Sequence, residues 1–146
     1  MPQLARVLSL ALVASLIAIG LGLATPAGAV ETRPDVHPEW GKTSTRAHRL
    51  KPGCANYRYR YAITPPDGEW ALETFLVGPG GDALGHDAMA IGMDGLSGRD
   101  SFRFCRASTR PGVFKIRALL SVQDSSGKDY VSGWLPVTKF RLRARR

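Results

Sequence analysis

The sequence predicts an all-β fold, a single antiparallel sandwich or barrel of about seven short strands that follows an N-terminal signal helix. From Arg46 onward, short apolar or aromatic stretches alternate with Gly, Pro, Asp and Ser at a spacing of roughly ten residues. No window keeps a helical period for three turns, whereas several stretches show the two-residue period of a half-buried strand. About 117 residues remain after the signal segment, which suits one domain with one core.

Residues 1–29 are predicted to form a cleavable signal peptide. A basic residue precedes an unbroken apolar run over residues 7–24, and Ala27 and Ala29 supply the small side chains that a signal peptidase requires. The alternative is an uncleaved membrane anchor, because the run nearly reaches the length of a transmembrane helix. The small residues directly downstream favour cleavage after Ala29. We therefore expect a secreted or envelope-associated protein without a transmembrane span after processing.

Residues 30–45 are predicted to be a flexible lead-in to the β domain, which would occupy residues 46–146. The lead-in is polar, contains two prolines after Val30 and has no hydrophobic period. A short first strand is expected near residues 47–51.

The segment CANYRYRYAIT predicts a strand with tyrosines on one face and Arg58 and Arg60 on the other. Such a ladder could be a binding platform on which rings stack against sugars or bases and guanidinium groups meet phosphate. One of the two faces must be buried, and burying tyrosines with bonded hydroxyls costs much less than burying two cations. We therefore expect the tyrosines in the core and the arginines outside.

The following stretch, EWALETFLVG, predicts a central strand. Trp70 and Leu76 share one face, but Phe75 and Val77 make the other face apolar as well, which is typical of a strand with neighbours on both sides. In the Gly-rich region after it, only a short strand near residues 88–93 is expected.

Three more strands are predicted in the C-terminal half. The segment DSFRFCRA alternates phenylalanines with Arg103 and Cys105, and VFKIRALLSVQD is the clearest alternation in the chain. The last strand passes through Phe140 and Leu142. Pro136 lies before them and predicts an edge position or a bulge, because proline cannot donate to a ladder.

Taken together, the seven strands, Trp70 in the third of them and the turn before the final strand resemble an immunoglobulin-like or fibronectin-III-like sandwich over about residues 46–143. The resemblance implies a fold and says little about function. The order Cys54, Trp70, Cys105 imitates the immunoglobulin signature, but Arg103 stands where that family carries a tyrosine.

Cys54 and Cys105 are the two cysteines of the chain, and an exported domain most simply pairs them. The bridge would close a loop of about fifty residues and stabilise the fold by roughly 4 kcal/mol. In the strand order that the resemblance implies, the second and fifth strands are antiparallel neighbours. The bridge would then join two strands of one sheet on its outer face.

The chain is strongly basic, with 20 Lys and Arg against 12 Asp and Glu and a net charge of +8. This balance favours an anionic polymer, an acidic glycan or an anionic lipid surface as partner, although it also suits a simply solvated surface. The C-terminal KFRLRARR could contact such a partner or could protect an edge strand from pairing. Nucleic acid is not expected for an exported protein. The candidate anion-binding residues are Arg58, Arg60, Lys139, Arg141, Arg143, Arg145 and Arg146.

No catalytic residue, cofactor or metal ligand is predicted. His86 has aspartates nearby, but no Gly-x-Ser-x-Gly nucleophile elbow accompanies it. Aspartates at 82, 87, 94 and 100 lie among glycines and could hold calcium, yet their spacing fits turn formation better. The sequence thus predicts a non-enzymatic binding or structural module. The alternative is an exported enzyme inhibitor or a small enzyme that uses the loops around His86 or Arg106–Gly112.

Overall fold

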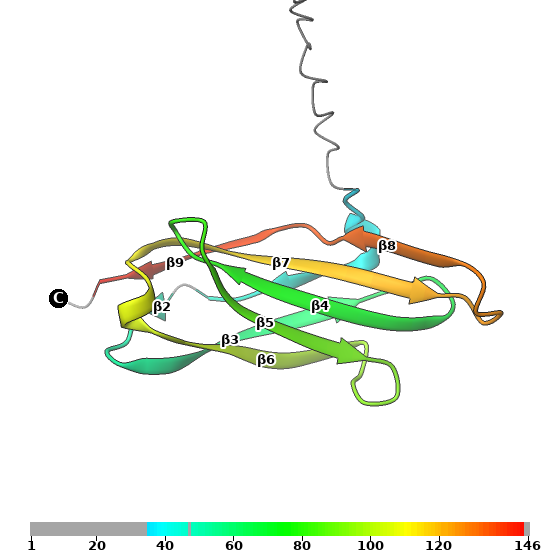
Figure 1. Cartoon of the computed structure of the whole chain (residues 1–146), viewed down its shortest axis with the longest axis horizontal. Coiled ribbons are helices and arrows are strands. Elements are labelled where there is room, and N and C mark those ends of the chain that lie inside the picture. Colours follow the sequence, from blue (N-terminus) through cyan, green and yellow to red (C-terminus); the bar gives the residue numbers. More distant parts are fainter. Residues whose placement is uncertain (1–34, 47, 145–146) are drawn as a thin grey trace, which may run out of the picture. The chain divides into compact units, whose positions relative to one another are not determined.

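A computed structural model describes residues 35–46 and 48–144 of the protein (Figure 1). The predicted signal peptide, residues 30–34, Ala47, Arg145 and Arg146 lie outside the described residues. Nearly all regular structure in the described part is strand, together with two short 3-10 turns, η1 (Pro38–Trp40) and η2 (Arg106–Ser108). Within these ranges, no helix is long and apolar enough to cross a membrane.

The strands form two sheets, which confirms the prediction of an all-β sandwich. The smaller sheet has the order β1-β3-β6, and both of its pairings are antiparallel. Its strands are β1 (Gly41–Ser44), β3 (Cys54–Ile63) and β6 (Ser97–Cys105). Alternation along β3 buries the tyrosines and exposes Arg58 and Arg60, as predicted.

The larger sheet has the order β2-β9-β7-β4-β5, with β8 paired to β7 beside β9. Its strands are β2 (His48–Arg49), β4 (Glu69–Val77), β5 (Ala83–Ala90), β7 (Gly112–Gln123), β8 (Tyr130–Trp134) and β9 (Thr138–Arg143). The predicted central position of β4 is confirmed, because β4 lies between β7 and β5. All pairings between these strands are antiparallel except the short parallel contact of β2 with β9.

The core lies between the sheets and is rich in aromatic rings. Tyr57 stacks on Phe104 with centroids 4.3 Å apart, and Phe104 stacks in turn on Phe114 of the opposite sheet at 5.8 Å. Phe114 continues the contact to Phe140 of β9 at 5.6 Å. One chain of rings therefore joins both layers, and each such pair adds about 0.5 to 1.5 kcal/mol beyond the area that it buries.

The disulfide forms as expected. Cys54 is the first residue of β3 and Cys105 the last of β6, and the two are directly opposite in the ladder and bonded to each other. Arg103 and the other outward residues of β6 share the side of the sheet on which the bridge lies. The bridge thus joins neighbours within one sheet, on its outer face.

Regular structure begins earlier than position 46. η1 and β1 lie within residues 30–45, and Val36 already pairs with Trp134 in a parallel bridge. Inside the domain, Thr43 of β1 is buried and hydrogen-bonds to Thr138 of β9 at 2.7 Å. This segment carries no apolar alternation, so the prediction of a flexible lead-in is wrong for residues 38–44. Their order comes from contacts with distant strands.

Two strand boundaries also differ from the prediction. β5 runs over Ala83–Ala90, earlier than the expected 88–93, because its pairing with β4 and not an apolar pattern defines it. The last strand is divided into β8 and β9. Together with β1, this division gives nine strands among the described residues, against the seven that were predicted.

A bulge at Pro136 divides the last strand. Trp134 lies opposite Leu119 and Thr138 lies opposite Ile116, so three residues of the last strand face two of β7. Leu135 is buried and its N–H still donates to a β7 carbonyl at 2.8 Å, whereas Pro136 has no N–H to donate. The bulge that the proline predicted is therefore present. β9 itself is not an edge along its whole length, because β2 pairs with its C-terminal end.

Candidate anion-binding surfaces

The outer face of the smaller sheet gathers five cations from three strands. Thr43 of β1 and the tyrosines of β3 point into the core, so their sequence neighbours point outward. In β6 the phenylalanines are buried and the residues between them face outward. We call this surface the basic face. It is made up of Lys42, Arg58, Arg60, Arg99 and Arg103, all of which are exposed.

The basic face carries no balancing acid. Along β1, β3 and β6, the outward positions that the structure describes are occupied by cations, by the cystine, by Ala62 and by Ser and Asn side chains. Within residues 35–46 and 48–144, every ion pair closer than 4.0 Å involves a histidine, so no described Lys or Arg is paired with a carboxylate. The field of these cations is therefore directed at solvent and attracts anions.

Arg60 and Arg99 stand directly opposite each other in the β3–β6 ladder. Like charges in such a position destabilise a sheet by a few tenths of a kcal/mol up to about 1 kcal/mol. Ser44 is the partner of Arg60 on its other side, in β1. Arg60 and Arg99 are thus cross-strand neighbours, and an anion bound between their guanidinium groups would reduce the repulsion.

An open hollow of about 350 Å³ lies at this end of the basic face. Three of the five cations line it, and two serine hydroxyls add neutral donors at its rim. Such a set can donate many hydrogen bonds to phosphate, sulfate or carboxylate oxygens, and guanidinium groups do so in a bidentate manner. The lining residues are Lys42, Ser44, Arg60, Tyr61, Ala62, Ser97, Gly98 and Arg99.

The C-terminal cations lie elsewhere. Lys139, Arg141 and Arg143 are exposed on β9, whereas Phe140 and Leu142 between them are buried. Because β9 belongs to the larger sheet, these cations occupy the outer face of the opposite layer from Arg58 and Arg60. Sheets in a sandwich pack about 10 Å apart, and side chains add to that separation, so salt screens one surface from the other at physiological ionic strength. Arg145 and Arg146 lie outside the described residues.

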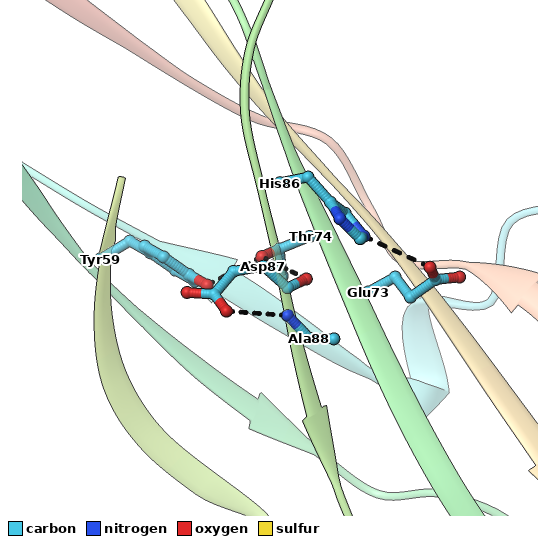
Figure 2. A network of polar contacts seen from close by, with 6 residues as sticks. All are labelled: Tyr59, Glu73, Thr74, His86, Asp87 and Ala88. Atoms are coloured by element: carbon cyan, nitrogen blue, oxygen red, sulfur yellow. Dashed lines mark hydrogen bonds and ion pairs between the residues drawn. The ribbon is translucent and has the colours of Figure 1, made fainter. Parts of the chain in front are cut away.

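His86 sits on the outer face of the larger sheet, in the opposite layer from the hollow. It stacks on Phe75 with centroids 4.8 Å apart, and its Nε2 lies 3.3 Å from Oε1 of Glu73 (Figure 2). Both side chains of this pair are about half exposed. Among the residues that the structure describes, no Ser hydroxyl is hydrogen-bonded to His86. The imidazole is oriented by a carboxylate on an open strand surface.

The aspartates of residues 80–100 come together only in part. Asp87 of β5 and Asp100 of β6 face each other where the two sheets meet, and partial burial and the negative charge of Asp87 raise the pKa of Asp100. Asp94 accepts a hydrogen bond from the Ala90 N–H in the turn between these strands, at 3.1 Å. Asp82 lies at the other end of β5. In the described part of the chain, no three His, Cys, Asp or Glu side chains are grouped closely enough to hold a metal ion.

The tyrosines of β3 belong to the core, as predicted. Each hydroxyl is satisfied: Tyr57 accepts from the Lys51 N–H, Tyr59 bonds to Thr74 and Tyr61 donates to the Gly95 carbonyl. A stacking platform on this strand is therefore excluded.

The loop 106–112 forms η2 and an exposed turn. Ser108 donates to the carbonyl of Cys105 at 2.7 Å, and the Arg106 N–H donates to Gly53, so the disulfide end of the smaller sheet holds this loop. A separate hollow of about 430 Å³ lies between Arg110 on this loop and Asp82. It combines one cation with one carboxylate and is less suited to an anion than the basic face.

Lys42, Arg99 and Arg103 are the members of the basic face that the candidate set from the sequence lacks. Alternation places Arg103 outward, and the strand order that the resemblance implies already puts it in one sheet with Arg58, so Arg103 could have been included in the candidate set. Comparison with protein-family models and with curated proteins gives no match for this chain.

Proposed function

We propose that this protein is an exported, non-enzymatic binding module whose basic face holds an anionic component of the cell envelope or the extracellular space. The observation that carries the proposal is the group of five unpaired cations on one sheet face with no outward carboxylate. A merely solvated surface would mix charges of both signs, because mixing lowers the repulsion among cations.

The position of the hollow supports the same function. Arg60 and Arg99 oppose each other without an intervening acid, and the polar residues around them are donors. Electrostatic attraction of this kind is screened by salt, so binding should weaken as ionic strength rises. The proposed ligand is anionic and presents several charges, as polymers and surfaces do.

We also infer that the sandwich is of immunoglobulin-like type. β3 and β6 pair in one sheet and β4 and β7 in the other, which matches the sheets of the corresponding strands B, E, C and F in an immunoglobulin-like sandwich. The disulfide within one sheet departs from the bridge between sheets that antibody domains carry. This inference concerns architecture and adds nothing to the choice of ligand.

The test compares two triple variants for binding to fluorescent dextran sulfate at physiological salt. Arg58→Ser/Arg60→Ser/Arg99→Ser removes three cations from the basic face, and each exposed contact contributes about 0.5 to 1 kcal/mol. We therefore expect affinity to fall at least about tenfold.

The matched control is Lys139→Ser/Arg141→Ser/Arg143→Ser, which removes the same charge from the opposite face. We expect it to bind nearly as well as the unaltered protein. Equal losses in both variants would mean that net charge alone governs binding. A larger loss in the control would place the site on β9.

A further inference from the structure

An apolar turn lies directly beside the hollow of the basic face. It connects β5 to β6 and exposes three large side chains: Ile91 by 47%, Met93 by 84% and Leu96 by 52%. We call these three residues the apolar tip. In Figure 1 the turn projects beyond the end of β6 at the edge of the layer formed by β3 and β6. Exposed apolar side chains that cluster in this way mark interaction sites.

The tip is held in place by hydrogen bonds. Within the turn, the N–H groups of Met93 and Asp94 donate to the Ala90 carbonyl, and the Asp94 carboxylate accepts from the Ala90 N–H. The turn is also tied to β3, because the N–H of Ile63 donates to the Leu96 carbonyl at 2.8 Å. The apolar side chains thus lie on a structured turn, and the carboxylate of Asp94 is hydrogen-bonded to the backbone of that turn.

The tip adjoins the hollow, because Leu96 directly precedes Ser97, which lines the hollow. Tyr61 is one of the residues that line the hollow, and the hydroxyl of its inward side chain donates to the Gly95 carbonyl within the turn at 3.1 Å. Ser97 and Arg99 follow the tip in sequence and line the hollow as well. Large apolar side chains therefore stand next to cations that have no carboxylate partners.

We propose that the ligand of the basic face is the surface of a bilayer that contains anionic lipid, and that the apolar tip inserts into it. This inference rests on the proposed function. Arg60 and Arg99 would meet lipid phosphates while Met93 and Leu96 enter the boundary between headgroups and acyl chains. A soluble polyanion would engage the cations and leave the tip in water, whereas a bilayer satisfies both parts of the surface.

The experiment uses protein purified after export and vesicles of phosphatidylcholine with or without phosphatidylglycerol. In a Met93→Trp variant, we expect a blue shift of emission, and quenching by brominated lipid beyond that of the unaltered protein, only when phosphatidylglycerol is present. We expect Met93→Ser/Leu96→Ser to bind these vesicles at least about tenfold more weakly. Because both residues are exposed, this variant should fold normally.

A matched control removes two exposed valines outside the tip, Val113→Ser/Val137→Ser, and should bind vesicles like the unaltered protein. Dextran sulfate distinguishes the two proposals. One outcome is that Arg58→Ser/Arg60→Ser/Arg99→Ser loses dextran sulfate binding, but the tryptophan introduced by Met93→Trp shows no blue shift with any vesicle. In that case the membrane inference is wrong and the proposed function stands. If neither dextran sulfate nor vesicles bind, the proposed function fails as well.

Discussion

On the basic face, Arg60 and Arg99 lower the stability of the folded protein. Arg60 and Arg99 oppose each other because the buried tyrosines of β3 fix the alternation, and this like-charge pair destabilises the sheet. A bound anion converts the repulsion into two favourable contacts. The same two side chains therefore weaken the free protein and strengthen the complex, so ligand binding should stabilise the fold.

In contrast, a buried hydrogen bond in the core stabilises the free protein. Tyr59 Oη lies 2.8 Å from Thr74 Oγ1, and Thr74 is fully buried (Figure 2). Thr74→Val keeps the shape but leaves the tyrosine hydroxyl without its partner, so we expect a loss of about 1 to 3 kcal/mol in urea unfolding. Adding Tyr59→Phe should cost less in this background than in the unaltered protein. Simple additivity of the two changes would contradict a direct bond.

Asp100 should make the stability depend on pH. Partial burial raises the pKa of Asp100, and Asp87 raises it further, so the folded state favours the protonated carboxyl. Its contribution to stability is present in full below the ordinary carboxyl pKa and is lost as pH rises through the raised value. Asp100→Asn should therefore be more stable than the unaltered protein at neutral pH, by no more than about 1 kcal/mol because solvent screens the site. Thermal unfolding in acid should show no difference.

Asp124 serves as the control for Asp100, because its effect on stability should depend on pH in the opposite direction. Hydrogen bonds from Ser126 and from backbone N–H groups lower the pKa of Asp124, so this carboxylate stabilises the fold above its ordinary pKa and loses that effect as pH falls. Asp124→Asn should be less stable than the unaltered protein at neutral pH and equal to it in acid. If both asparagine variants shifted in the same direction, the local environments would not explain the pH dependence.

At the level of elements, β3 has two roles. Its inward residues build the aromatic core, and its outward residues supply two of the five cations of the basic face. The disulfide fixes the first residue of β3 against the last residue of β6, and the ladder runs in register from there to Ala62 and Ser97. The bridge therefore also fixes the register that places Arg60 opposite Arg99.

Removing the disulfide tests this role. Cys54→Ser/Cys105→Ser opens a loop of about fifty residues, so we expect the free energy of unfolding to fall by roughly 4 kcal/mol in urea titrations. The two positions lie on the outer face, and serine leaves no cavity there. The unaltered protein under reducing conditions should match the variant. A variant that unfolds at the same urea concentration as the oxidised protein would show that β3 and β6 need no covalent link.

For the whole molecule, the sequence predicted what alternation controls. The all-β sandwich, the buried tyrosines and the outward arginines of β3 follow from which residues share a side of a strand, whereas the outer-face disulfide also needed the strand order that the resemblance implies. Features that depend on distant pairing were missed. β1 has no apolar period of its own, and β5 owes its extent to its pairing with β4.

The candidate site was predicted only in part for the same reason. Alternation tells whether Arg58 or Arg141 points outward, but it does not tell which sheet each strand joins. The two groups that the sequence suggested as one field lie on opposite faces. Lys42 and Arg99 come within reach of Arg60 only through the order β1-β3-β6, which no local pattern encodes.

The bulge at Pro136 also determines which side chains of the last strand point outward before and after it. Trp134 and Lys139 are an odd number of positions apart, yet both lie opposite outward residues of β7. Deleting one residue between them would make this number even, so a regular ladder would keep Trp134 and Lys139 outward and Phe140 and Leu142 in the core without a bulge. Deleting two residues would leave an odd number of positions again and would require another irregularity, so the length of this connection is constrained in parity.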